Sequence, residues 1–240
     1  YTFPMLCDSD VFKNNDVRMA LKHAVDREAM VKTILLGYGY AGNDHPITAS
    51  NRFFNAELEQ RQYDPDKARF YMRKAGLDKL RVQLHASDAA YAGAVDTSVM
   101  FKEQAKKAGI EIDVSREPSD GFWSSVWHKK PFCTSFWYSS LTADRMFSLG
   151  YARDASWNES HWKHERFNQL LTSARGELND TLRREMYNEM QQLCRDEGGS
   201  IIPMFASSVA ARTTRVAHGG ATAPFGELDG LRIIERWWLA

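Results

Sequence analysis

The sequence predicts an α/β protein with an open sheet flanked by helices, and three stretches support this class. Residues 81–87 and 110–116 alternate apolar with polar side chains, as strands do, and a helical pattern fills residues 94–108 between them. Because strand, helix and strand at this spacing form a βαβ unit, we expect these two strands to be parallel. Residues 132–138 predict a third strand of the same sheet, since apolar or aromatic side chains lie on both of its faces.

The remaining helices are predicted by apolar residues at helical spacing that follow capping residues. The capping residues of the first three are Asn14, Asp26 and Asp64. Pro65 stands at the first helical position, which proline favours. Three more helices are expected at residues 143–151, 167–174 and 182–193.

Other stretches have no regular pattern. The GxGxxG at residues 37–42 follows a helix instead of a strand, so it predicts a glycine loop that ends the helix and not a dinucleotide site. Residues 43–62 are expected to be an irregular connection. After about residue 200 the chain is extended and apolar and has no partner strands of its own, so we expect it to pack on another part of the protein.

Composition excludes several classes of function. The chain has 240 residues, with 31 basic and 31 acidic side chains, and this zero net charge argues against non-specific binding of nucleic acid. No apolar run approaches the roughly 20 residues of a membrane span, so we expect no membrane insertion. The three cysteines lack metal-binding spacing, and His161 and His164 lack a third ligand, so we expect no metal or cofactor.

A candidate binding site follows the predicted third strand. Polar residues that end a buried strand at the start of a helix are where α/β proteins place ligands. Aromatic side chains also concentrate in this part of the chain, and aromatic walls with a few polar groups are typical of small-molecule pockets. The residues expected to line the cleft are Trp137, Ser139, Ser140, Asp144, Trp157 and Asn158.

Several segments together resemble a known family. NNDVRMALKHAVDREAMVKTILLGYG at residues 14–39 and YDPDKARFYMRKAGL at residues 63–77 are similar to two helical signatures of extracytoplasmic solute-binding proteins of ABC importers. Residues 158–170, with their Trp and Phe-Asn, resemble a third signature. The similarity is to the oligopeptide, dipeptide and nickel class, family 5.

The resemblance implies a periplasmic-binding-protein-like fold with two lobes that close on a ligand. Residues 1–6 would connect the lobes and residues 7–200 would form the far ligand-binding lobe, with a mixed open sheet. Residues 201–240 would cross over and return to the near lobe, whose amino-terminal part, with its signal peptide, we expect to be missing. The implied role is periplasmic capture of a peptide or small solute for membrane permease subunits, without catalysis.

One position departs from the family pattern. In the family, a tryptophan at the end of the ligand-facing strand is followed three residues later by an aspartate that holds a peptide's α-amino group. Trp137 matches the tryptophan, but Ser140 occupies the aspartate position and Asp144 lies four residues further on. Recognition of a free amine is therefore in doubt. The alternative function is an α/β enzyme with a cleft at the end of residues 132–138 that uses Asp144 and a nearby histidine.

Overall fold

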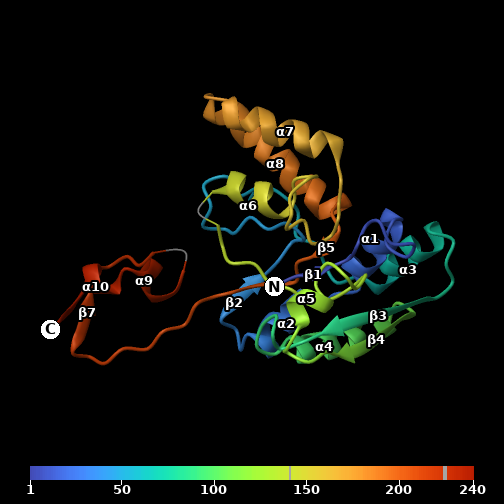
Figure 1. Ribbon diagram of the computed structural model, residues 1–240, viewed down its shortest axis with the longest axis horizontal. Coiled ribbons are helices and arrows are strands. Elements are labelled where there is room, and N and C mark those ends of the chain that lie inside the picture. The colour runs from blue at the N-terminus through green and yellow to red at the C-terminus, as the bar shows by residue number, and fades with distance from the viewer. Residues whose placement is uncertain (141, 224–225) are drawn as a thin grey trace.

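The computed structural model describes residues 1–140, 142–223 and 226–240 (Figure 1), and it contains the predicted βαβ unit. Strands β3 (Leu80–Ala86) and β4 (Ile110–Arg116) pair in parallel, in a register that places Leu80 opposite Ile110. Helix α4 (Ala94–Lys106) connects them and packs on both strands. The parallel pair predicted from the spacing is confirmed.

The continuous strand predicted at residues 132–138 is wrong. Only single bridges form there: His85 with Cys133 in parallel, and Met5 with Phe132 and Thr2 with Ser135 antiparallel. Because β3 ends at Ala86, the described chain offers residues 136–138 no ladder partner. Residues 132–135 therefore join β3 to the amino-terminal segment and make the sheet mixed, while residues 136–138 leave it.

The expectation that the chain after residue 200 lacks partner strands is also wrong. Strand β5 (Ser200–Ile201) pairs antiparallel with β1 (Phe3–Pro4). Strand β6 (Met204–Ala206) pairs antiparallel with β2 (Gly39–Ala41). Strands of two or three residues are too short to produce a recognisable alternation, which is why the sequence did not predict them.

The glycines at residues 37–42 do more than end a helix. Gly37 adopts a left-handed conformation, with φ of 82°, in the turn that follows the helix ending at Ile34, as expected. Gly39 and Gly42 instead lie against the returning chain, where a Cβ added to Gly42 would be 2.1 Å from the carbonyl oxygen of Ile202. Glycine is required there because the two backbones approach too closely for a side chain.

The three amino-terminal helices and their caps are confirmed. They are α1 (Asn15–His23), α2 (Arg27–Ile34) and α3 (Pro65–Lys74). The side chains of Asn14, Asp26 and Asp64 each accept a backbone N–H of the following first turn. Helix α1 packs against α3. The short helix α5 (Phe122–Ser125) precedes the bridge residues.

A second group of helices has a core of its own. Helices α6 (Ala143–Gly150), α7 (Glu165–Gly176) and α8 (Asp180–Glu197) stand together to one side of the sheet in Figure 1. Their core centres on Phe147, Phe167 and Tyr187. A separate core around Phe3, Phe101 and Phe132 lies at the sheet. The described body thus has two hydrophobic cores.

The carboxy-terminal segment leaves this body after β6. Its elements are β7 (Val216–His218), α9 (Glu227–Leu231), α10 (Ile233–Arg236) and β8 (Trp237–Leu239), and β7 pairs antiparallel with β8. Figure 1 shows this unit away from helices α6, α7 and α8, at the end of a long extended connection. The division into a far lobe and a returning segment stays a prediction. No helix in the described ranges has both the length and the apolarity to cross a bilayer.

A buried carboxylate connects four segments of the body. The Asp44 carboxylate is 2.7 Å from Arg27 Nη2 and 2.9 Å from Arg61 Nε, and all three side chains are nearly inaccessible. Asp44 also accepts the backbone N–H of Ile202 at 2.9 Å. Burial by itself raises the pKa of Asp44, but Arg27, Arg61 and Lys22 outweigh it and lower the pKa to about 2. Asp44 is therefore ionised in the folded protein.

The end of α8 depends on cations of α1. Lys22 Nζ is buried and donates to the carbonyl oxygens of Cys194, Arg195 and Gly198 at 3.2, 2.9 and 2.8 Å. Arg18 donates to the Glu197 carbonyl at 2.7 Å. Carbonyls of a last helical turn have no partner within the helix, so these side chains supply the missing donors. Arg18 and Arg27 of the first helical signature therefore have structural roles.

We predict that Asp44→Asn destabilises the protein by roughly 3 to 5 kcal/mol, because among the described residues Arg27 then has no counter-charge and Arg61 keeps only its pair with the partly exposed Asp196. The measurement is urea unfolding followed by circular dichroism. The matched control is Asp10→Asn, which removes the same charge from an exposed pair with Lys13 and should leave the unfolding midpoint unchanged. Equal midpoints for the two variants would contradict the assigned role of Asp44.

Candidate functional site

Residues 136–140 form an aromatic strap that runs from the sheet toward α6. The Trp137 ring lies against Gly150 of α6, where an added Cβ would be 3.1 Å from Trp137 Cζ2. Its centroid is 6.0 Å from that of Trp157. Tyr138 and Trp157 are 76% and 52% exposed. The strap therefore presents large aromatic surfaces to solvent, with Trp137 fixed beneath them.

Two polar atoms of the strap are buried without a partner. Neither Trp137 Nε1 nor Ser140 Oγ has a hydrogen-bond partner among the described residues. A buried polar group left unpaired costs about 1 to 3 kcal/mol, so each such group calls for an explanation, such as an ordered water, an ion or a ligand. One is a donor only, and the other is a hydroxyl that donates or accepts. Both suit a polar ligand placed beside the aromatic surface.

The other predicted site residues have different surroundings. Ser139 is exposed. Asp144 accepts a hydrogen bond from Arg175 Nε at 2.8 Å, as half of an ion pair. Asn158 is buried, and its Nδ2 donates to the carbonyl oxygens of Ala152 at 3.2 Å and Trp162 at 2.7 Å, so its amide hydrogens already hold its own loop. The structure brings Trp137 and Trp157 together with the strap serines, and the assignment of all six residues to a cleft stays a prediction.

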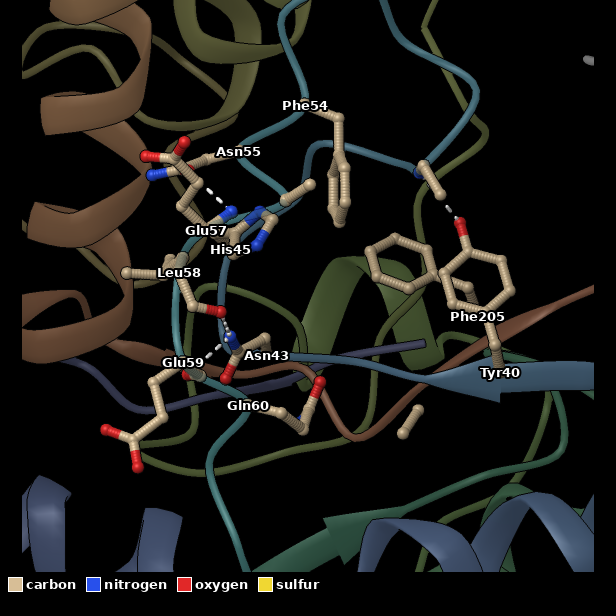
Figure 2. Close-up of a pocket in the computed structure, with 13 residues that line it drawn as sticks. Tyr40, Asn43, His45, Phe54, Asn55, Glu57, Leu58, Glu59, Gln60 and Phe205 are labelled. Atoms are coloured by element: carbon tan, nitrogen blue, oxygen red, sulfur yellow. Dashed lines mark hydrogen bonds between the residues drawn. The ribbon is translucent and has the colours of Figure 1, made fainter.

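Sequence reasoning missed a pocket formed by β2, β6 and the connection at residues 43–60. Its volume is about 350 Å³. Figure 2 shows the rings of Tyr40, Phe205 and Phe54 on one side and His45 with Asn43 on the other. The Tyr40 and Phe205 rings stack with centroids 5.0 Å apart. The one signal in the sequence is the unusual density of Asn, His and aromatic residues in a stretch without periodicity.

His45 is the distinctive polar group of this pocket. It is 1% exposed, and its Nδ1 has no hydrogen-bond partner among the described residues. Burial lowers the pKa of His45 from 6.5 to about 4, against the opposing effect of Asp44. Its ring centroid is 5.9 Å from that of Phe54. The pocket therefore offers a neutral imidazole beside aromatic walls, a combination that suits a polar ligand with an apolar part.

The described residues do not form a catalytic arrangement around Asp144. Its ion-pair partner is Arg175, and no histidine of the described ranges forms a hydrogen bond or ion pair with it. The histidines near carboxylates are His85 with Glu117 at 2.6 Å, His161 with Asp8 at 2.8 Å and His164 with Glu197 at 3.2 Å. Among the described residues, no Ser, Thr or Cys side chain forms a hydrogen bond with a histidine, as a nucleophile and its general base would. Nor do three His, Cys, Asp or Glu residues of the described ranges group as metal ligands.

Comparison with known proteins identifies the family. The family model described as "Bacterial extracellular solute-binding proteins, family 5 Middle" matches residues 1–159. The chain belongs to this family, so the resemblance inferred from the helical signatures is confirmed.

Individual relatives are distant in sequence. The chain is 24% identical over 226 residues to the dipeptide-binding protein of Escherichia coli K12, covering 88% of this chain and 41% of that protein. It is 23% identical over 237 residues to heme-binding protein A of Haemophilus influenzae, and the match covers 90% of this chain and 40% of that protein. The structure of HbpA2 from Haemophilus parasuis superposes with a TM-score of 0.76 at 20% sequence identity. The superposition covers 85% of this chain and 42% of that protein. The chain thus shares their fold and spans about two fifths of their length.

We predict that His45 makes the protein less stable as the pH falls below about 6.5. Between the unfolded-state pKa of 6.5 and the folded-state pKa of about 4, His45 is protonated in the unfolded chain but neutral in the folded chain. Stability therefore decreases as the pH falls, until about pH 4. From about pH 7 to about pH 5, the wild type should lose about 2 kcal/mol more than His45→Gln. Urea unfolding at both pH values measures the difference. Parallel losses in the two proteins would show that His45 is not held neutral by burial.

Proposed function

We propose that this chain is the ligand-binding lobe of an extracytoplasmic solute-binding protein. It captures a peptide or other small solute in the periplasm and delivers it to the membrane permease subunits of an ABC importer. The observation that carries the proposal is the aromatic strap, where Trp137 Nε1 and Ser140 Oγ are buried without a partner among the described residues, beside the exposed rings of Tyr138 and Trp157. Membership of the solute-binding family supports it.

Binding is favoured over catalysis. The enzyme hypothesis requires a base and an orienting group around Asp144, and that carboxylate is paired with Arg175. The two curated relatives are named as a dipeptide-binding protein and a heme-binding protein. Aromatic walls with a few unpaired polar atoms are sufficient to bind a solute and do not require catalytic groups.

The strap also constrains the solute. An ammonium group in a closed cleft needs a nearby anion, because an unpaired buried charge costs several kcal/mol. Ser140 is neutral, and Asp144 is already neutralised by Arg175. We infer that the solute does not present a free α-amino group to the strap and that a neutral or anionic solute, or a blocked peptide, fits better.

Closure of two lobes should govern affinity. We predict that this chain alone binds the native solute at least ~100-fold more weakly than a protein with both lobes, a loss of roughly 2.7 kcal/mol, because one lobe supplies only part of the contacts. Native mass spectrometry of the two-lobed protein identifies the co-purified solute, and calorimetry compares the proteins. Failure of both proteins to bind any solute would contradict the proposed function.

Ser140→Asp should create affinity for free-amine peptides. In the two-lobed protein, we predict at least about tenfold tighter binding of unmodified dipeptides, because the new carboxylate compensates the ammonium group. Acetylated dipeptides should gain nothing. The control is Ser173→Asp, which adds the same charge to the exposed surface of α7. Strong binding of unmodified dipeptides by the wild type would show that the missing anion does not determine the solute.

A further inference from the structure

An accumulation of positive charge lies beyond the aromatic strap. Three guanidinium groups surround the Phe53 ring, with the Cζ atoms of Arg52, Arg184 and Arg183 at 4.8, 5.5 and 5.6 Å from its centroid. Arg183 is also 6.0 Å from the centroid of Tyr187. Stacking on a ring stabilises one cation, but three cations around one ring repel each other.

The described carboxylates neutralise only part of this charge. Asp180 pairs with Arg52 at 2.7 Å and Asp144 pairs with Arg175 at 2.8 Å. Arg183 and Arg184 form no ion pair with a described residue; Arg184 instead donates to the Arg52 carbonyl oxygen at 2.7 Å. Arg183 Nε is buried and has no acceptor in the described chain. Arg183 lines a cavity and forms no ion pair with a described residue, so its guanidinium is available to pair with an external anion.

A cavity lies at these groups. Its volume is about 350 Å³, and its lining includes Arg183, Arg175, Phe53, Tyr187, Thr142 and Asp144. Helix α6 begins at this basic pocket, and the amides of its first turn add partial positive charge. Thr142 and Asp144 closely follow the strap along the chain, so the basic pocket adjoins the candidate ligand-binding surface.

We propose that the basic pocket binds the acid group of a small organic anion, with Arg183 as its principal donor. A carboxylate or a phosphate would accept from Arg183, while a flat apolar part of the molecule would contact the rings of Phe53 and Tyr187. That this anion is the acidic end of the captured solute rests on the proposed function. The class of solute is then an organic acid, in agreement with the neutral Ser140 in the strap and the pairing of Asp144 with Arg175.

The test uses matched small probes and this chain. Benzoate, phenyl phosphate and the neutral benzamide are titrated in ligand-observed NMR at low ionic strength. We expect at least one of the two acids to bind about tenfold or more tightly than benzamide, and Arg183→Gln to remove this selectivity. Benzoate and phenyl phosphate distinguish a carboxylate site from a phosphate site. Equal binding of all three probes by the wild type overturns the proposal.

Two further variants control for charge and folding. Arg166→Gln removes the same charge from an exposed pair with Glu189 and should keep the preference for the acid. Arg183→Lys should retain part of it, and circular dichroism checks that each variant is folded. An equal loss in Arg166→Gln and Arg183→Gln contradicts the assignment to Arg183. The anion-site proposal and the proposed function can fail separately. If the two-lobed protein captures no solute but this chain still selects the acid through Arg183, only the proposed function is contradicted.

Discussion

The fold depends on a single carboxylate that is removed from water together with two arginines. Asp44 receives hydrogen bonds from Arg27 at the start of α2, from Arg61 before α3 and from the backbone of Ile202 between β5 and β6. Arg61 reaches further, to the Arg195 carbonyl near the end of α8. Desolvating these charges is expensive, and it is offset only when all the partners are in place. The network therefore requires one specific arrangement of segments that are far apart in the chain.

This arrangement also positions the candidate site. His45 follows Asp44 directly, so the anchored Asp44 side chain helps to place the His45 imidazole in the pocket that Tyr40 and Phe54 also line. Lys22 and Arg18 fasten the end of α8, which orients the helical group that supports Trp137 and Arg183. The loops around His45 and at the end of α8 are thus held in place by the buried hydrogen bonds of Asp44, Lys22 and Arg18.

The aromatic strap has the opposite character. It leaves the sheet where the backbone ladder ends, and its side chains pack on α6 on one side and meet solvent on the other. Among the described residues, Trp137 Nε1 and Ser140 Oγ of the strap have no hydrogen-bond partner, whereas both oxygens of the Asp44 carboxylate accept hydrogen bonds. A paired buried carboxylate beneath a surface with unpaired polar atoms agrees with the proposal that the strap contacts a ligand.

The sequence by itself determined the βαβ unit, the caps at Asn14, Asp26 and Asp64, and the family, because each depends on neighbours within one helix or strand. Tertiary structure alone decided that residues 136–138 leave the sheet, that β5 and β6 return to β1 and β2, and that Asp144 turns to Arg175. It also placed His45 in a pocket and three arginines around Phe53. These features depend on contacts between residues that are distant in the chain or that lie in different elements, so local patterns do not predict them.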